Sequence, residues 1–199
     1  MNPTARAMKH RRRRLSNAGV YAVIFALLSG FIAIPSSAQG ERSLERSVKA
    51  AFLYKFAGYI EWPAHSMPAG DSPIVIGVAH EAALADELER IVPGRRFDNH
   101  PIAVRRVKEG EPLAGIHILF IGGADQTRTG ALVRAAQTHP MLVVTELENG
   151  LALGSGINFV LIDGRVRFEA APDAVDKTGL KLSSRLLSVA SNARGGSAP

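Results

Sequence analysis

The sequence predicts an α/β fold: a single domain with a mostly parallel central sheet, flanked by helices and carrying a C-terminal β-hairpin. Short apolar runs bounded by turn residues alternate with stretches of helical periodicity. An Asp-Gly pair, Asp163-Gly164, separates two β-rich runs at 157–162 and 165–169, which is typical of a tight type I′ hairpin. Neither an internal repeat nor a linker divides the chain.

The first helix of the domain is expected after a polar lead-in at 39–42 and before Trp62-Pro63, because the residue before a proline resists the α conformation. Apolar side chains recur there at helical spacing, at Leu44, Val48, Ala51, Phe52, Phe56 and Tyr59.

The later elements alternate along the chain. Strands are expected at 74–78, 102–107, 116–121 and 141–145, where β-rich apolar runs stand between turn residues. Helices are expected at 81–91, 128–138 and 172–178, and a last helix carries Leu182, Leu186 and Val189, with Ser183 or Ser184 as its cap.

Residues 1–38 have the organisation of a cleaved secretory signal, so that residues 39–199 form the working domain. A basic segment is followed by an apolar run at 20–34, and then by Ser36 and Ala38, whose small side chains fit the pockets of signal peptidase. The apolar run is shorter than the ~20 residues of a spanning helix, which favours cleavage after Ala38 over an uncleaved anchor. The sequence therefore predicts a protein that acts outside the cytoplasm, exported by the Sec or the twin-arginine route.

The basic charge of the chain belongs to this leader. The whole chain has 24 Lys and Arg against 18 Asp and Glu, and the leader holds six of the basic residues and no acidic one, so the remainder is balanced. A domain whose basic and acidic residues are equal in number gives no support for nucleic-acid binding. The chain has no cysteine, which excludes disulfides, thiol nucleophiles and Cys-ligated metal.

No motif in the domain points to catalysis, a metal or a cofactor. The histidines do not form H-x-x-x-H or H-E-x-x-H, and no G-x-S-x-G surrounds Ser183-Ser184. Gly122-Gly123 follow a buried strand and precede a helix, where backbone N–H groups suit a phosphate, but a structural turn is the favoured interpretation without a complete glycine motif. The residues alone predict a binding or regulatory module rather than an enzyme.

Distinctive motifs stand at both ends of the domain. AFLYKF at 51–56 is followed by EWP at 61–63, and GLKLSSRLL occupies 179–187. Weaker matches between them keep the same order. Together these segments resemble the YfiR-like family of periplasmic regulators over residues 48–190.

The resemblance implies a protein that binds the periplasmic part of an inner-membrane diguanylate cyclase (YfiN-like) and represses it, which lowers cyclic-di-GMP and biofilm formation. It also implies a homodimer, and a YfiB-like outer-membrane lipoprotein as a second partner. YfiR carries cysteines that form disulfides, whereas this chain has none, so redox control is not transferred.

A partner surface is expected in the C-terminal segment, with Phe168, Leu182 and Leu186 as apolar anchors and with Glu169 and Arg185 at a polar rim. Helical spacing marks a buried face without saying against what it is buried. Core positions are therefore an equal alternative for the three apolar residues.

The alternative function is a periplasmic module that binds a small ligand or a cell-wall fragment at the carboxyl ends of the strands. Trp62, Gly122 and Gly123 would take part in that site. A hydrolase of the cell envelope is less favoured, because no catalytic site is evident.

Overall fold

The computed structural model describes residues 36–123 and 125–192. The predicted signal sequence lies outside this part of the chain except for residues 36–38. Within the described ranges, no helix has the length and hydrophobicity that a membrane crossing requires.

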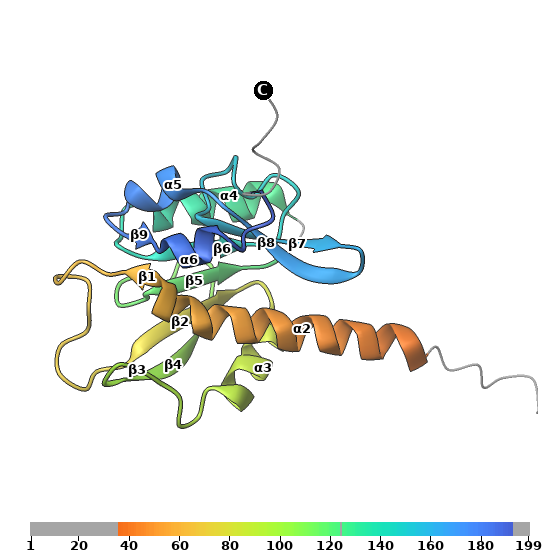
Figure 1. Cartoon of the computed structure of the whole chain (residues 1–199), viewed down its shortest axis with the longest axis horizontal. Helices are drawn as coiled ribbons and strands as arrows, with labels where there is room; N and C mark the ends of the chain where they lie inside the picture. The colour runs from red at the N-terminus through yellow and green to blue at the C-terminus, as the bar shows by residue number, and fades with distance from the viewer. Residues whose placement is uncertain (1–35, 124, 193–199) are drawn as a thin grey trace, which may run out of the picture. The chain divides into compact units, whose positions relative to one another are not determined.

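A seven-stranded sheet forms the centre of the domain, in the order β3-β4-β2-β5-β6-β7-β8 (Figure 1). The strands from β4 to β7 in this order pair in parallel, while β3 and β8 are antiparallel at the two edges. In spatial order the bounds are Arg96–Phe97, His100–Val107, Ile74–Ala79, Ile118–Ile121, Leu142–Thr145, Ile157–Ile162 and Arg165–Ala170. The predicted fold class is confirmed. Strand β3 was not predicted, because a two-residue strand leaves no periodic pattern.

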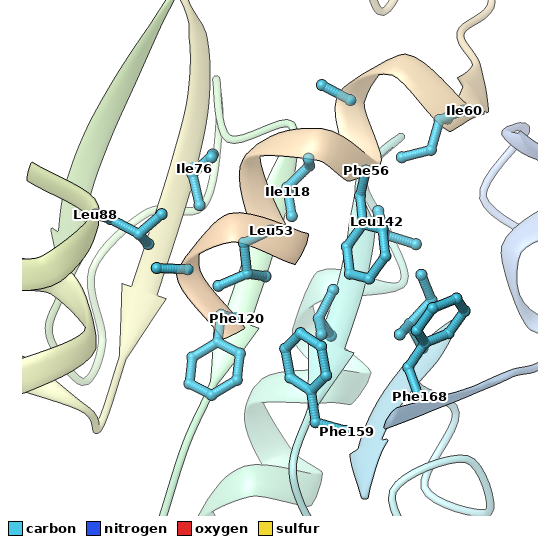
Figure 2. Packing of buried hydrophobic residues seen from close by; sticks show 14 of the residues in the cluster. Leu53, Phe56, Ile60, Ile76, Leu88, Ile118, Phe120, Leu142, Phe159 and Phe168 are labelled. Carbon is cyan, nitrogen blue, oxygen red and sulfur yellow. The ribbon is translucent and has the colours of Figure 1, made fainter. Parts of the chain in front are cut away.

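Helices cover both faces of the sheet. On one face, α2 (Ser36–Phe56) and α3 (Ala82–Ile91) enclose the larger apolar core, into which Ile118 and Phe120 of β5 point (Figure 2). On the other face, α4 (Gln126–Ala136) covers Leu119 and Ile121. Because α3 follows β2 and α4 follows β5, the chain leaves these two neighbouring strands toward opposite faces, which makes their carboxyl ends a topological switch point.

Helix α2 begins earlier than predicted, and its buried face agrees with the prediction only in part. Phe56 is buried as predicted, and Phe52 packs against the core, whereas Leu44 is 67% exposed, so the prediction of Leu44 on the apolar face was wrong. Ala50 and Leu53, which were not predicted on this face, are buried. Leu44 lies in the N-terminal half of α2, which extends past the sheet (Figure 1). The helix ends in the 3-10 turn η1 (Ala57–Tyr59), and the short strand β1 (Ile60–Glu61) follows.

The C-terminal hairpin has the predicted turn. Asp163 and Gly164 have φ values of 51° and 69°, and Ile162 pairs with Arg165 across them, as a two-residue type I′ turn requires. Helix α5 (Pro172–Asp176) follows, and Gly179 after it has a φ of 80°.

The last segment packs back onto the sheet. Strand β9 (Lys181–Leu182) pairs with β1, and α6 (Ser184–Leu187) is capped by Ser183, whose hydroxyl oxygen accepts a hydrogen bond from the backbone N–H of Leu186. Beyond α6, the Asn192 side chain binds both backbone groups of Ala170 in β8, accepting from its N–H at 3.1 Å and donating to its C=O at 2.8 Å.

Candidate functional site

The carboxyl ends of β2, β5 and β6 form an edge that helix α2 borders. Glu81 follows β2, Gly122 follows β5 and Glu146 follows β6, so residues distant in sequence meet there. The cavity between α2 and this edge measures about 260 Å³. It is lined by Arg42, Glu45, Arg46, Lys49, Glu81, Leu84 and Glu146.

Lys49 of α2 is the central cation of this cavity. Its Nζ donates to Glu146 Oε2 at 2.6 Å and also to Glu45, one helical turn away. Its side chain is 14% exposed. Burial by itself lowers the pKa of Lys49, but the hydrogen bonds to Glu146 and Glu45 outweigh burial and raise that pKa. Lys49 therefore stays charged and ties α2 to the end of β6.

Gly122 lets the strand ends approach one another. Its N–H donates to the C=O of Ala79 at 2.9 Å, and a Cβ at this position would lie 2.7 Å from Glu81 Cβ and 3.2 Å from Glu146 Oε1. Such contacts are too close for any other residue without displacement of the neighbours. Because Gly122 has no side chain, the carboxylate-bearing residues Glu81 and Glu146 can both lie close to it.

A groove of about 440 Å³ adjoins the cavity and runs toward the hairpin. Near its hairpin end, Leu161 and Ile162 are 57% and 43% exposed, an unusual exposure for neighbouring large apolar side chains. Both the hairpin and the N-terminal half of α2 extend beyond the rest of the sheet (Figure 1). The groove is lined by Glu45, Lys49, Glu146, Leu147, Glu148, Phe159, Val160 and Leu161.

The structure separates Trp62 from Gly122 and Gly123. The Trp62 indole N–H donates to the C=O of Ala57 at 3.1 Å, and its ring packs against His117 with centroids 5.9 Å apart. His117 immediately precedes β5, whereas Gly122 follows the same strand. Trp62 therefore lies near the amino end of β5, and Gly122 and Gly123 lie at its carboxyl end. The three residues expected for a ligand site do not form one site.

The three expected apolar anchors lie in the core. Phe168, Leu182 and Leu186 are 3%, 8% and 3% exposed, and the Phe168 ring meets that of Phe56 edge-on at 5.4 Å (Figure 2). The structure thereby decides for the core alternative at these positions, because their side chains already pack against α2 and the sheet. Of the expected rim, Arg185 is exposed and Glu169 is half-buried.

The charged cavity was not predicted from the sequence. Its only local signal is the placement of Arg42, Glu45, Arg46 and Lys49, which share one side of α2 at spacings of three and four residues. Glu81 and Glu146 join them only through the strand order. Within the described ranges, no three His, Cys, Asp or Glu side chains are grouped so as to hold a metal ion.

The sequence matches the model of the YfiR/HmsC-like family over residues 46–191. No curated protein matches the sequence significantly. The family match begins within α2, includes both distinctive terminal motifs and every strand of the sheet, and ends at Ser191 beside β8. Because it spans most of the chain, the protein belongs to the YfiR/HmsC-like family.

Proposed function

We propose that the protein is a non-enzymatic periplasmic regulator that binds and represses an inner-membrane diguanylate cyclase, lowering cyclic-di-GMP and biofilm formation. The observation that carries this proposal is the family match over residues 46–191. The YfiR-like motifs at 51–63 and 179–187 lie within it, and they supply the expected partner, the periplasmic part of a YfiN-like cyclase.

Export is part of the proposal. Residues 1–38 act as a signal peptide, and cleavage after Ala38 releases residues 39–199 into the periplasm. The cut falls within α2, so the mature protein starts in the projecting part of that helix. Intact-mass analysis of protein from the periplasmic fraction tests this step, and a mass that retains the leader would contradict it.

Repression follows from preferential binding. A regulator that binds the inactive conformation of the cyclase more tightly than the active one shifts the population toward inactivity. A strong switch needs a difference of roughly 5 kcal/mol between the two binding free energies. No chemical step is required of the regulator.

The contact surface that we propose is the hairpin end with its adjoining groove. Leu161 and Ile162 supply exposed apolar area, and the groove brings the acidic Glu146 and Glu148 beside it. This chemistry suits an apolar segment of the cyclase that carries basic side chains. Arg185 and Glu169 remain separate polar candidates for a partner contact, whereas the apolar contribution expected of Phe168, Leu182 and Leu186 passes to Leu161 and Ile162.

Two apolar side chains of similar exposure, Leu161 and Val189, provide a matched test. Leu161→Asp is expected to keep the melting curve of the parent but to lose repression, so that cyclic-di-GMP rises to the level of a gene deletion. Val189→Asp changes a residue of similar exposure, 55%, outside the proposed surface and is expected to repress like the parent. Equal repression by both variants would exclude the hairpin surface. An unchanged cyclic-di-GMP level in the deletion strain, with the cyclase expressed, would contradict the function itself.

The resemblance also supports a homodimer and a second, YfiB-like lipoprotein partner at the outer membrane, and we include both in the proposal. Light scattering on the mature protein tests the dimer. A pulldown from membranes with the tagged protein tests both partners, and Arg185→Glu in the same pulldown, at low and high salt, tests a contact through Arg185.

A further inference from the structure

We propose that the cavity at the carboxyl edge of the sheet binds a small zwitterion, a short peptide with a free ammonium group and a free carboxylate. This inference goes beyond repression of the cyclase, because it assigns the regulator a ligand of its own.

The position of the cavity is the first argument. It lies beside the switch point between β2 and β5, where the chain leaves toward α3 on one face and α4 on the other, and open α/β sheets bind ligands at such crevices.

The balance of charge is the second argument. Three cationic side chains, Arg42, Arg46 and Lys49, and three carboxylates, Glu45, Glu81 and Glu146, line the cavity. A simple anion would meet the carboxylates, and a simple cation would meet the arginines. A ligand that carries one charge of each sign complements the whole wall.

Arg42 and Arg46 belong to α2, one helical turn apart, while Glu81 and Glu146 follow β2 and β6. The remaining two charged residues, Glu45 and Lys49 of α2, pair with each other, and Lys49 also pairs with Glu146. We therefore place the ligand carboxylate toward the two arginines and its ammonium group toward Glu81 and Glu146. The volume of about 260 Å³ lies just below the range of ordinary small-molecule pockets and suits a dipeptide.

The cavity shares three lining residues, Glu45, Lys49 and Glu146, with the groove of the proposed partner surface. A ligand ammonium group near Glu146 competes with Lys49 for that carboxylate. If the proposed function holds, the bound peptide therefore alters the groove and the strength of repression. Ligand binding itself needs no cyclase, so the two ideas fail separately.

The test uses purified full-length mature protein and the probe L-alanyl-L-alanine in isothermal titration. N-acetyl-L-alanyl-L-alanine, which lacks the ammonium group, and L-alanyl-L-alaninamide, which lacks the carboxylate, are the matched probes. We expect saturable binding of the dipeptide and a loss of about tenfold or more in affinity for each matched probe, because each leaves charged side chains without their partner.

Variants locate the site. Glu81→Gln and Arg46→Gln are expected to weaken dipeptide binding about tenfold while keeping the melting temperature of the parent. Arg128→Gln, in a separate cavity of about 350 Å³ beside α4, is the control and should bind like the parent. Absence of binding up to about 10 mM dipeptide, equal affinity for all three probes, or parental affinity of both cavity variants would each overturn the proposal.

Discussion

The Nδ1 atom of His117 accepts a hydrogen bond from the backbone N–H of Val75 at 3.1 Å, and the Val75 C=O in turn accepts from the His117 N–H at 3.0 Å. This reciprocal pair joins β2 to the residue that precedes β5. His117 is 8% exposed, and burial, with a smaller effect from the charge of His100, lowers the pKa of its imidazole. The ring is therefore neutral, with its proton on Nε2.

This arrangement predicts an acid-sensitive contribution to stability. The pKa of His117 is lower in the folded state than its ordinary value of 6.5, so the unfolded state binds the proton more readily. The contribution of His117 to stability is complete above pH 6.5 and falls as the pH drops from there toward the folded pKa. Protonation also replaces the accepted hydrogen bond by a contact between the Nδ1–H of His117 and the backbone N–H of Val75. We expect the loss to be on the order of 1 kcal/mol, the size of one hydrogen bond.

Urea unfolding at about pH 8 and about pH 5.5 measures this effect. His117→Asn is the control, because an amide oxygen can take the place of Nδ1 without titrating. The variant should lose less stability than the parent between the two pH values. Identical pH dependence of the two proteins would contradict a role for His117.

Removal of the Lys49 cation should destabilise the domain. Lys49→Met leaves Glu45 and Glu146 facing one another, and Glu146 is only 20% exposed, so we expect a loss of about 1–3 kcal/mol in the free energy of unfolding. The double variant Lys49→Met/Glu146→Gln should recover part of it. Arg90→Met breaks an ion pair whose arginine is 68% exposed, and as a control it should cost less than about 1 kcal/mol.

The side chain of Asn158 in β7 forms hydrogen bonds with the backbone N–H and C=O groups of Leu147, which follows β6. Its side chain is 1% exposed, accepts from the Leu147 N–H at 3.0 Å and from the Thr145 hydroxyl at 2.8 Å, and donates to the Leu147 C=O at 2.8 Å. Asn158→Leu leaves both Leu147 groups without this partner, at a cost of about 2–4 kcal/mol by urea unfolding.

Asn158→Asp tests the hydrogen bond that Asn158 donates apart from the two that it accepts. A carboxylate can still accept from Leu147 and Thr145 but cannot donate to the Leu147 C=O, whereas a protonated carboxyl group can. The stability difference between this variant and the parent should therefore narrow as the pH is lowered. A difference that stays constant with pH would contradict the assigned hydrogen bonds.

Neighbouring residues of α6 should respond in opposite ways to a negative charge. Leu186 is 3% exposed, so Leu186→Glu places a carboxylate in the core and should unfold the domain, with a loss of more than about 3 kcal/mol. Arg185 is exposed, and Arg185→Glu should retain the melting curve of the parent. Circular dichroism melting of both variants checks this, and a folded Leu186→Glu would contradict the core position.

The parts of the fold that could be predicted are those specified by short stretches of sequence. The hairpin at Asp163-Gly164 follows from the backbone preferences of two residues, and β2 follows from one apolar run between turn residues. The β1–β9 pair could not be predicted, because Ile60 and Leu182 lie far apart in the chain and each strand has two residues. Leu44 was misplaced because periodicity identifies a helix face but not the point where the sheet beneath it ends.

The candidate site illustrates the same limit. Gly122 was identified from its position after a strand, but its neighbours Glu81 and Glu146 are brought to it by the strand order β2-β5-β6, which no local pattern encodes. Phe168 was expected either as an apolar anchor for a partner or as a core residue, and the sequence alone did not tell these two roles apart. Only the packing of Phe168 against Phe56 distinguishes them.

The contact between Asn192 and Ala170 has a consequence for solubility. Strand β8 is at the edge of the sheet, and such an edge can recruit a strand from another molecule and start aggregation. The Asn192 amide occupies both backbone groups of Ala170, as a neighbouring strand would, and the Ser191 N–H occupies the C=O of Phe168. Ser191 and Asn192 thus occupy backbone groups on the open edge of β8. A chain truncated before Ser191 would leave these groups free to pair with a strand of another molecule.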